Sequence, residues 1–262
     1  MKIKFASLAS GSAGNAYVLT ADGRSLMVDC GIGCREFLKR AGEAGVDPRS
    51  IEAVLFTHSH DDHVRGAKAL KKILPDVKFF ASALTAEAAA EKTGLDIDDF
   101  LVFEHGQPFE AGAFSAQAFS VPHDTPDAAG FVVHAGGFTY FHATDVGSPL
   151  ESIGKNLEQA DLAVLEFNHD EILLAGSNRS ERLKRRIRGP SGHLSNREAA
   201  SLAARYASAR LRKLFLAHIS RECNSPHLAE REAAEALAAA GKGRIPCLAL
   251  AQDEVAVFES EV

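Results

Sequence analysis

Hydrophobic residues along the chain form short runs and helical repeats, separated by polar turns. Apolar stretches at 2–8, 16–20 and 25–29 predict three strands, and Asp22-Gly23 between the last two is typical of a hairpin. The pattern then predicts strands at 52–57, 77–81, 100–103, 113–121, 129–134, 138–142, 161–167, 213–217 and 247–258. It predicts helices at 33–44, 63–73, 83–93, 180–188, 195–208 and 226–240. Helices interspersed among strands in both halves indicate an α/β protein.

Length and composition favour one globular domain spanning residues 1–262. The chain is 46% hydrophobic and 24% charged, which is typical of a soluble domain. No run of 18 apolar residues predicts a membrane span, and the polar Ser10 comes before a signal-peptide core could form. Four cysteines without a C-x-x-C pair are expected to be reduced thiols, so we expect a cytoplasmic protein. The formal charge of −6 excludes a broad positive field, so any polyanion must be met locally.

The strongest chemical signal is an H-x-H-x-D-H pattern, formed by His58, His60, Asp62 and His63, where a predicted strand ends and a helix begins. In an extended segment His58 and His60 project to one side, while Asp62 and His63 can face a neighbouring point. Three histidines in one short loop repel one another when protonated and are costly to desolvate without a cation. This segment could therefore serve two divalent metal ions; a histidine-rich polar loop is the alternative interpretation.

Further metal ligands are expected at the ends of later strands, because two ions need about four ligands each and usually share a carboxylate. His123 follows the predicted strand 113–121, Asp145 follows 138–142, and His218 follows 213–217. For each residue alone, a structural role is the stronger interpretation. Their joint placement favours metal binding.

With these motifs in order, the chain resembles the metallo-β-lactamase superfamily over nearly its whole length. The resemblance implies a four-layer αββα sandwich and two divalent metal ions, zinc or manganese first and iron as a further option. It also implies one metal site with His58, His60 and His123, and a second with Asp62, His63 and His218. Asp145 would bridge the two sites. An aspartate at this position, where the best-known zinc β-lactamases have cysteine, points to the dinuclear hydrolase and phosphodiesterase branches.

The stretch from Gly192 to Ala200, which includes His193, is similar to the tRNA 3′-processing endonucleases (RNase Z), where the equivalent histidine assists phosphodiester cleavage. Those enzymes carry a long glycine- and proline-rich arm, which is absent here. The chain more closely resembles the YycJ (WalJ)-like subgroup in the segments 10–15, 29–31, 121–125, 168–170 and 189–196. One departure is Cys223-Asn224, where two adjacent asparagines are expected. This resemblance implies an exonuclease that acts from 5′ ends on single-stranded DNA, with a role and partners in DNA repair.

Other residues are candidates for supporting the chemistry. Ser12 and Asn15 lie in a glycine-containing loop that could contact substrate or simply form a turn. Six cations between 179 and 188 precede His193; a solvated helix face is the default interpretation, but Arg185 and Arg186 could contact phosphates. Glu166, and similarly His169, is expected to orient a metal-ligand or catalytic histidine through a hydrogen bond.

The predicted reaction is two-metal phosphodiester hydrolysis, with Asp62 and His193 as catalytic residues. A small-molecule hydrolase cleaving a thioester, lactone or cyclic nucleotide is the enzymatic alternative. A nucleic-acid-binding scaffold with structural metals is the alternative from another class. The sequence predicts no membrane attachment and no particular oligomeric state.

Overall fold

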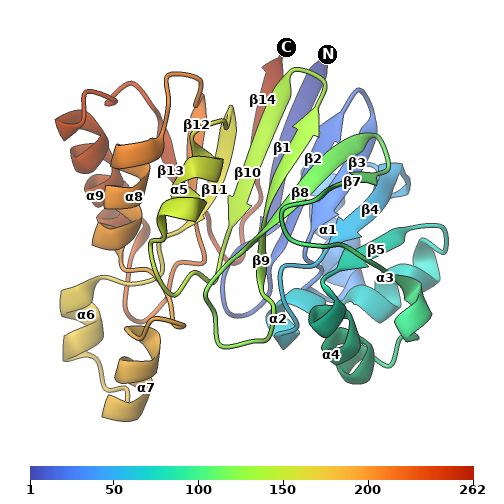
Figure 1. Ribbon diagram of the computed structural model, residues 1–262, viewed down its shortest axis with the longest axis horizontal. Coiled ribbons are helices and arrows are strands. Elements are labelled where there is room, and N and C mark those ends of the chain that lie inside the picture. The colour runs from blue at the N-terminus through green and yellow to red at the C-terminus, as the bar shows by residue number, and fades with distance from the viewer.

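Two seven-stranded β-sheets pack face to face in the computed structural model, which describes residues 1–262 (Figure 1). The first sheet has the strand order β14 (Ala256–Glu261), β1 (Lys2–Ala9), β2 (Ala16–Ala21), β3 (Arg24–Val28), β4 (Ile51–Leu55), β5 (Lys78–Ala81) and β6 (Phe100–Val102). The second has the order β13 (Cys247–Ala249), β12 (Lys213–Ala217), β11 (Leu162–Glu166), β10 (Phe138–Ala143), β9 (Ala129–Ala135), β8 (Phe114–Ser120) and β7 (Pro108–Ala111). The last strand, β14, returns to the first sheet and pairs antiparallel with β1.

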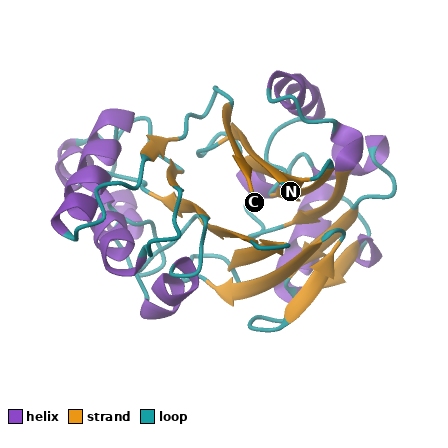
Figure 2. Cartoon of the chain, turned by 90° about the horizontal axis from the view of Figure 1, so that it is seen from above, coloured by secondary structure: helices purple, strands orange, loops and turns teal.

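Helices cover the outer face of each sheet, as Figure 2 shows from above. Beside the first sheet lie α1 (Cys34–Glu43), α2 (Asp61–Val64), α3 (Ala67–Ile73) and α4 (Ala83–Thr93). Beside the second lie α5 (Glu151–Leu157), α8 (Asn196–Tyr206) and α9 (Pro226–Ala239), with the short α6 (Glu171–Gly176) and α7 (Glu181–Ile187) below them in Figure 1. The predicted four-layer αββα sandwich is therefore confirmed. None of these helices combines the length and apolar character needed to cross a membrane.

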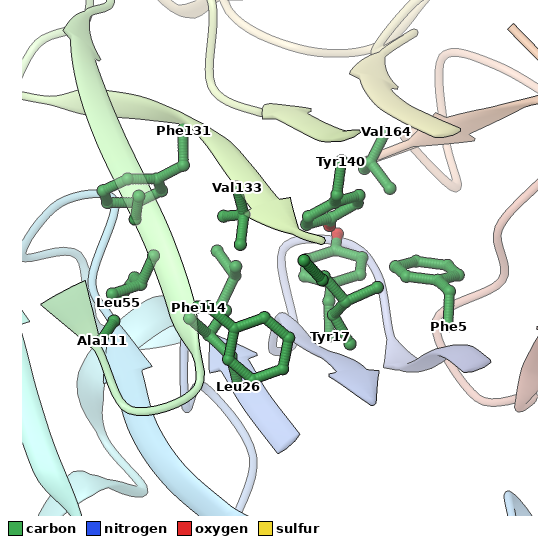
Figure 3. Packing of buried hydrophobic residues seen from close by; sticks show 14 of the residues in the cluster. Phe5, Tyr17, Leu26, Leu55, Ala111, Phe114, Phe131, Val133, Tyr140 and Val164 are labelled. Atoms are coloured by element: carbon green, nitrogen blue, oxygen red, sulfur yellow. The ribbon is translucent and has the colours of Figure 1, made fainter. Parts of the chain in front are cut away.

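Three separate hydrophobic clusters hold the four layers together. Because side chains alternate along a strand, one strand contributes to two of these clusters. Leu162 and Val164 of β11 face the other sheet, while Leu165 faces the helices. The cluster between the sheets is rich in aromatic rings, and the ring centroids of Phe5 and Tyr140 lie 5.6 Å apart (Figure 3). Burial on both faces explains the nearly continuous apolar runs of the central strands.

Local differences from the sequence prediction have physical causes. The predicted hairpin is present, with φ of 46° at Asp22 and 83° at Gly23. The predicted helix 63–73 is instead divided into α2 and α3 around Gly66, where a Cβ atom would lie 2.2 Å from the Ile32 carbonyl oxygen. The elements β7, α5 and α6 are not predicted, because each is too short for a clear periodicity; the signal for α6 is its N-cap, Asp170.

The topology brings several strand ends to one edge of the sandwich. The strands β3 and β4 of the first sheet run parallel, as do β10, β11 and β12 of the second. The strand β8 shares the direction of β10, because both pair antiparallel with β9. The polar segments that follow these strands therefore lie together, at the carboxyl-terminal edge where α/β folds commonly bind ligands.

Candidate metal and catalytic centre

Three histidines form the first cluster. His58 Nε2 lies 3.0 Å from His60 Nδ1, and His123 Nε2 lies 3.4 Å from the same atom. His58 follows β4 and is buried, while His123 follows β8 and its Nδ1 lies 3.2 Å from the carbonyl oxygen of Gly192. The ring nitrogens of all three lie within 4.8 Å of one another, so one cation could contact all three.

A second cluster lies beside the first. His63 Nε2 is 3.6 Å and His218 Nε2 is 3.7 Å from Asp62 Oδ2. Asp62 and His63 stand on α2, while His218 comes directly after β12 in the other sheet. The geometry therefore places the second predicted ligand group together.

Asp145 lies between the two clusters. Its Oδ2 is 3.2 Å from His63 Nε2, and its Oδ1 is 3.8 Å from His123 Nε2. The carboxylate thus faces one histidine from each cluster, as a bridging ligand must. The structure brings all seven predicted ligands together, with donors supplied by both sheets.

The unpaired atoms of this centre fit divalent cations. Asp145 Oδ2 and His218 Nε2 are buried and have no hydrogen-bond partner. Leaving such atoms without a partner is costly, and coordination to a cation removes that cost. Imidazole nitrogens and carboxylate oxygens suit zinc, manganese and iron.

The charges in the cluster are strongly coupled. Burial alone would lower the pKa of His63, but the carboxylates of Asp29 and Asp145 raise it well above the usual value. Burial also opposes protonation of His218, yet Asp145, with Asp62 and Glu166, raises its pKa to about 10. The pKa of Asp145 is lowered well below its usual value, because the neighbouring histidines outweigh burial. Without a cation, protons on the histidines balance the carboxylates.

A buried network holds the ligand His63 in place. Asp29 Oδ2 lies 2.7 Å from His63 Nδ1, and Thr57 donates to Asp29 from both its amide and its hydroxyl. This fixes the ring so that Nε2 points to Asp62 and Asp145. The sequence analysis assigns no role to Asp29 or Thr57; the signal for Asp29 is a polar residue at the end of a buried strand.

Three polar residues at strand ends adopt left-handed backbone conformations. The φ angles are 58° at Asp29, 56° at Asp145 and 55° at His218. This region is uncommon for residues other than glycine and is found at sites where the surroundings fix an otherwise unfavourable geometry. The turns direct these side chains into the centre.

Glu166, the last residue of β11, is hydrogen-bonded to two histidines of the centre. Its Oε1 lies 2.8 Å from His193 Nδ1 and 3.0 Å from His218 Nδ1. Its Oε2 accepts hydrogen bonds from the amides of Val146 and Leu194. Burial would raise the pKa of Glu166, but His193 and His218 lower it to about 2, so the carboxylate is charged at neutral pH. Glu166 thereby fixes His193, whose other ring nitrogen, Nε2, remains for a ligand.

A polar pocket of about 330 Å³ opens over the centre. None of its lining residues is hydrophobic: they are Ser12, His60, Asp61, Asp62, Lys92, Asp145, Arg186, His193 and His218. Both predicted catalytic residues therefore face the same space as the ligand clusters. Such a lining suits a polar, anionic substrate.

The other predicted contacts are distributed differently. Asn15 is fully buried and does not line the pocket; its Nδ2 atom lies 3.0 Å from Nε2 of the candidate ligand His63. Ser12 and Arg186 line the pocket, whereas Arg185 is exposed outside its lining. His169 is buried, but its side chain forms no hydrogen bond to a candidate ligand.

Comparison with known proteins agrees with this arrangement. A family described as "Beta-lactamase superfamily domain" matches residues 24–219. The chain belongs to the β-lactamase superfamily. Its metallo-β-lactamase fold is also that of the protein YhfI from Bacillus subtilis, with a TM-score of 0.73 and 20% identity over 99% of this chain and all of that one. The predicted family and fold are confirmed.

Two curated relatives of this superfamily member are nucleases by name. The chain is 30% identical to "Exodeoxyribonuclease WalJ" of Streptococcus pneumoniae over 243 residues, covering 92% of this chain and 90% of the relative. It is 28% identical to "Exodeoxyribonuclease YycJ" of Bacillus anthracis over 244 residues, covering 93% and 92%. The resemblance to the YycJ (WalJ)-like subgroup and the prediction of an enzyme are confirmed.

Proposed function

We propose that this protein is a dinuclear-metal-dependent exonuclease that degrades single-stranded DNA from the 5′ end and takes part in DNA repair. The observation that carries the proposal is the meeting of seven metal-ligand candidates at the floor of a polar pocket, which four of them line together with His193. The exodeoxyribonuclease names of two relatives that match over most of their length support the choice of DNA.

The residues of the centre divide into ligands and groups that handle the substrate. His58, His60 and His123 would hold one cation, Asp62, His63 and His218 the other, and Asp145 both. When bound, the two cations would supply Lewis acidity for the phosphate and lower the pKa of an attacking water.

The chain's own groups complete the reaction. The pKa of Asp62 is lowered because His218 and His63 outweigh the effect of burial, so its carboxylate is ionised and can accept a hydrogen bond from the attacking water. His193 can donate a proton from Nε2 to the leaving oxygen, since Glu166 holds its Nδ1. Arg186 and Lys92 at the pocket wall can neutralise phosphate oxygens.

The polar lining of the pocket helps to distinguish a nuclease from the small-molecule hydrolase and the scaffold. Thioesters and lactones present apolar acyl chains, and no hydrophobic side chain lines the pocket to receive one. A cyclic nucleotide is compatible with the same lining. A scaffold with structural metals fits less well, because structural sites close their coordination while this centre opens on a pocket.

The test is digestion of matched single-stranded DNA and RNA oligonucleotides, labelled at either end, with manganese or zinc added. The Asp62→Ala variant serves as the blank. We expect metal-dependent, stepwise loss of DNA from the 5′ end, and none with the variant. A fully metallated protein that cleaves no oligonucleotide would refute the nuclease proposal and favour a small-molecule hydrolase.

A further inference from the structure

A second group of cations lies beside the candidate centre, and only Lys92 among them has a role in the proposed chemistry. Arg65 follows α2, Lys68 and Lys72 stand on α3, and Lys92 stands on α4. All four are exposed. They line a groove of about 490 Å³, called here the α3–α4 groove, together with Asp61, Val64, Ala69 and Thr93.

The α3–α4 groove is continuous with the catalytic pocket. Asp61 and Lys92 line both. Lys92 Nζ donates to the carbonyl oxygen of Ser59, 2.7 Å away, between two of the candidate metal ligands. Arg65 donates to the carbonyl oxygen of Ala13, next to Ser12 of the pocket. A chain that enters the pocket can therefore continue into the groove.

The cations of the groove keep most of their charge free for a ligand. Lys68 Nζ donates to the carbonyl oxygen of Gly94 at 2.8 Å, and a carbonyl does not neutralise an ammonium charge. Lys72 has no carboxylate within 4.0 Å. Asp61 is the only acidic residue in the lining; it lies 3.7 Å from Lys92 with its side chain 81% exposed, where an ion pair is weak.

Of the six cations between 179 and 188, near α7 on the opposite side of the pocket, only Arg186 lines the pocket. Arg186 forms a 2.5 Å ion pair with Asp124, and Arg179 forms one of 2.9 Å with Glu222. Lys184 is buried. Figure 1 shows α7 and α4 on either side of the end of the sandwich that carries α2. Next to the pocket, the α3–α4 side therefore offers the more available positive charge, although the denser basic run in the sequence is at 179–188.

We propose that the α3–α4 groove binds the sugar-phosphate backbone of the nucleic-acid strand beyond the phosphate that is cleaved. This rests on the proposed nuclease function. Lys68 and Lys72 are one helical turn apart, about 6 Å along the axis, so they can contact different phosphates. No aromatic residue lines the groove, so it contacts the backbone without stacking bases and confers no sequence preference.

The test compares a long and a short substrate in the metal-loaded enzyme. The Lys68→Glu/Lys72→Glu variant reverses two charges in the groove. The control, Lys155→Glu/Arg231→Glu, makes the same net charge change on the exposed surfaces of α5 and α9, beside the other sheet. Substrates are a single-stranded oligonucleotide of ~20 nucleotides and the thymidine dinucleotide TpT, which has no phosphate beyond the one that is cleaved.

We expect the groove variant to lose at least about tenfold in kcat/KM on the long strand, mainly through KM. Its log kcat/KM should depend less steeply on log salt, by about 0.7 for each lost phosphate contact. The groove variant should cleave the dinucleotide like wild type, and the control should match wild type on both substrates. A groove variant equal to the control on the long strand overturns this inference alone. A wild-type enzyme that cleaves neither substrate overturns it together with the proposed function.

Discussion

Replacing the buried carboxylate of Glu166 tests the proposed roles of His193 and His218 at once. Glu166 accepts four hydrogen bonds, two from imidazoles and two from backbone amides. In Glu166→Gln the side chain has nearly the same shape, but one oxygen becomes an NH₂ group that cannot accept. Two of the four donors therefore lose their partner.

The expected loss of stability of Glu166→Gln can be worked out in two ways. An unpaired buried polar group costs about 1–3 kcal/mol, so two cost about 2–6 kcal/mol. The pKa of Glu166, lowered from 4.5 to about 2, corresponds to ~3 kcal/mol in favour of the charged form. Because the folded-state pKa is depressed, this contribution is present above pH 4.5 and is lost as the pH falls toward 2.

The assay is urea unfolding of the metal-free wild type and variant, with metal affinity and turnover measured in parallel. We expect a stability difference of ~3 kcal/mol at pH 7 that narrows below pH 4.5. Metal affinity should fall about 10–100-fold, since Glu166 orients the candidate ligand His218. Turnover at saturating metal should fall as well, because His193 loses its fixed orientation.

Glu198→Gln is the matched control for the carboxylate-to-amide change. Glu198 caps α8 through Ser195 and has no hydrogen bond to a histidine. It should lose some stability while keeping turnover and metal affinity. Wild-type turnover and metal affinity in Glu166→Gln would refute the reasoning.

Three further changes probe other parts of the centre. His193→Ala should lower turnover about 100-fold with metal content unchanged; coincident loss of metal, by atomic absorption, would make His193 a ligand instead. Metal binding near pH 7.5 should release about two protons, because the raised pKa values of His63 and His218 keep both protonated until a cation displaces the protons, so affinity rises with pH. Calorimetric heats that do not depend on the ionisation enthalpy of the buffer would contradict this. Tyr17→Phe should cost about 1–2 kcal/mol in urea unfolding, because the fully buried hydroxyl lies 2.9 Å from Ser10 Oγ and 3.1 Å from Asn15 Oδ1; an unchanged midpoint would show that hydrogen bonding by this hydroxyl contributes nothing.

The sequence predicted well what depends on local patterns. Alternation and apolar runs identified most strands. The spacing of His58, His60, Asp62 and His63 indicated a metal motif, because all four lie within one six-residue segment. His218 was found at a strand end, where the direction of parallel strands fixes its place. The four-layer arrangement came from the family resemblance, since periodicity alone indicated only an α/β protein.

What the sequence did not predict depends on contacts through space. Asp29 supports His63 across the boundary between two strands, and no local pattern marks that contact. Asn15 lies in a glycine-containing loop that suggested either a substrate contact or a turn, and its burial against His63 could not be read from that local pattern. The α3–α4 groove combines Lys68 with Lys92 from another helix, so its cations do not form a run in the sequence.

The division of the candidate ligands between the two sheets has a consequence for how the protein matures. His63 follows a strand of the first sheet and His218 a strand of the second, far apart along the chain. Contacts between such distant segments form late in folding, because a large loop must close first. The donor set is therefore incomplete until the sheets have docked. In the cell, the complete donor set, and with it the full affinity for metal, is therefore available only to a chain whose two sheets have docked.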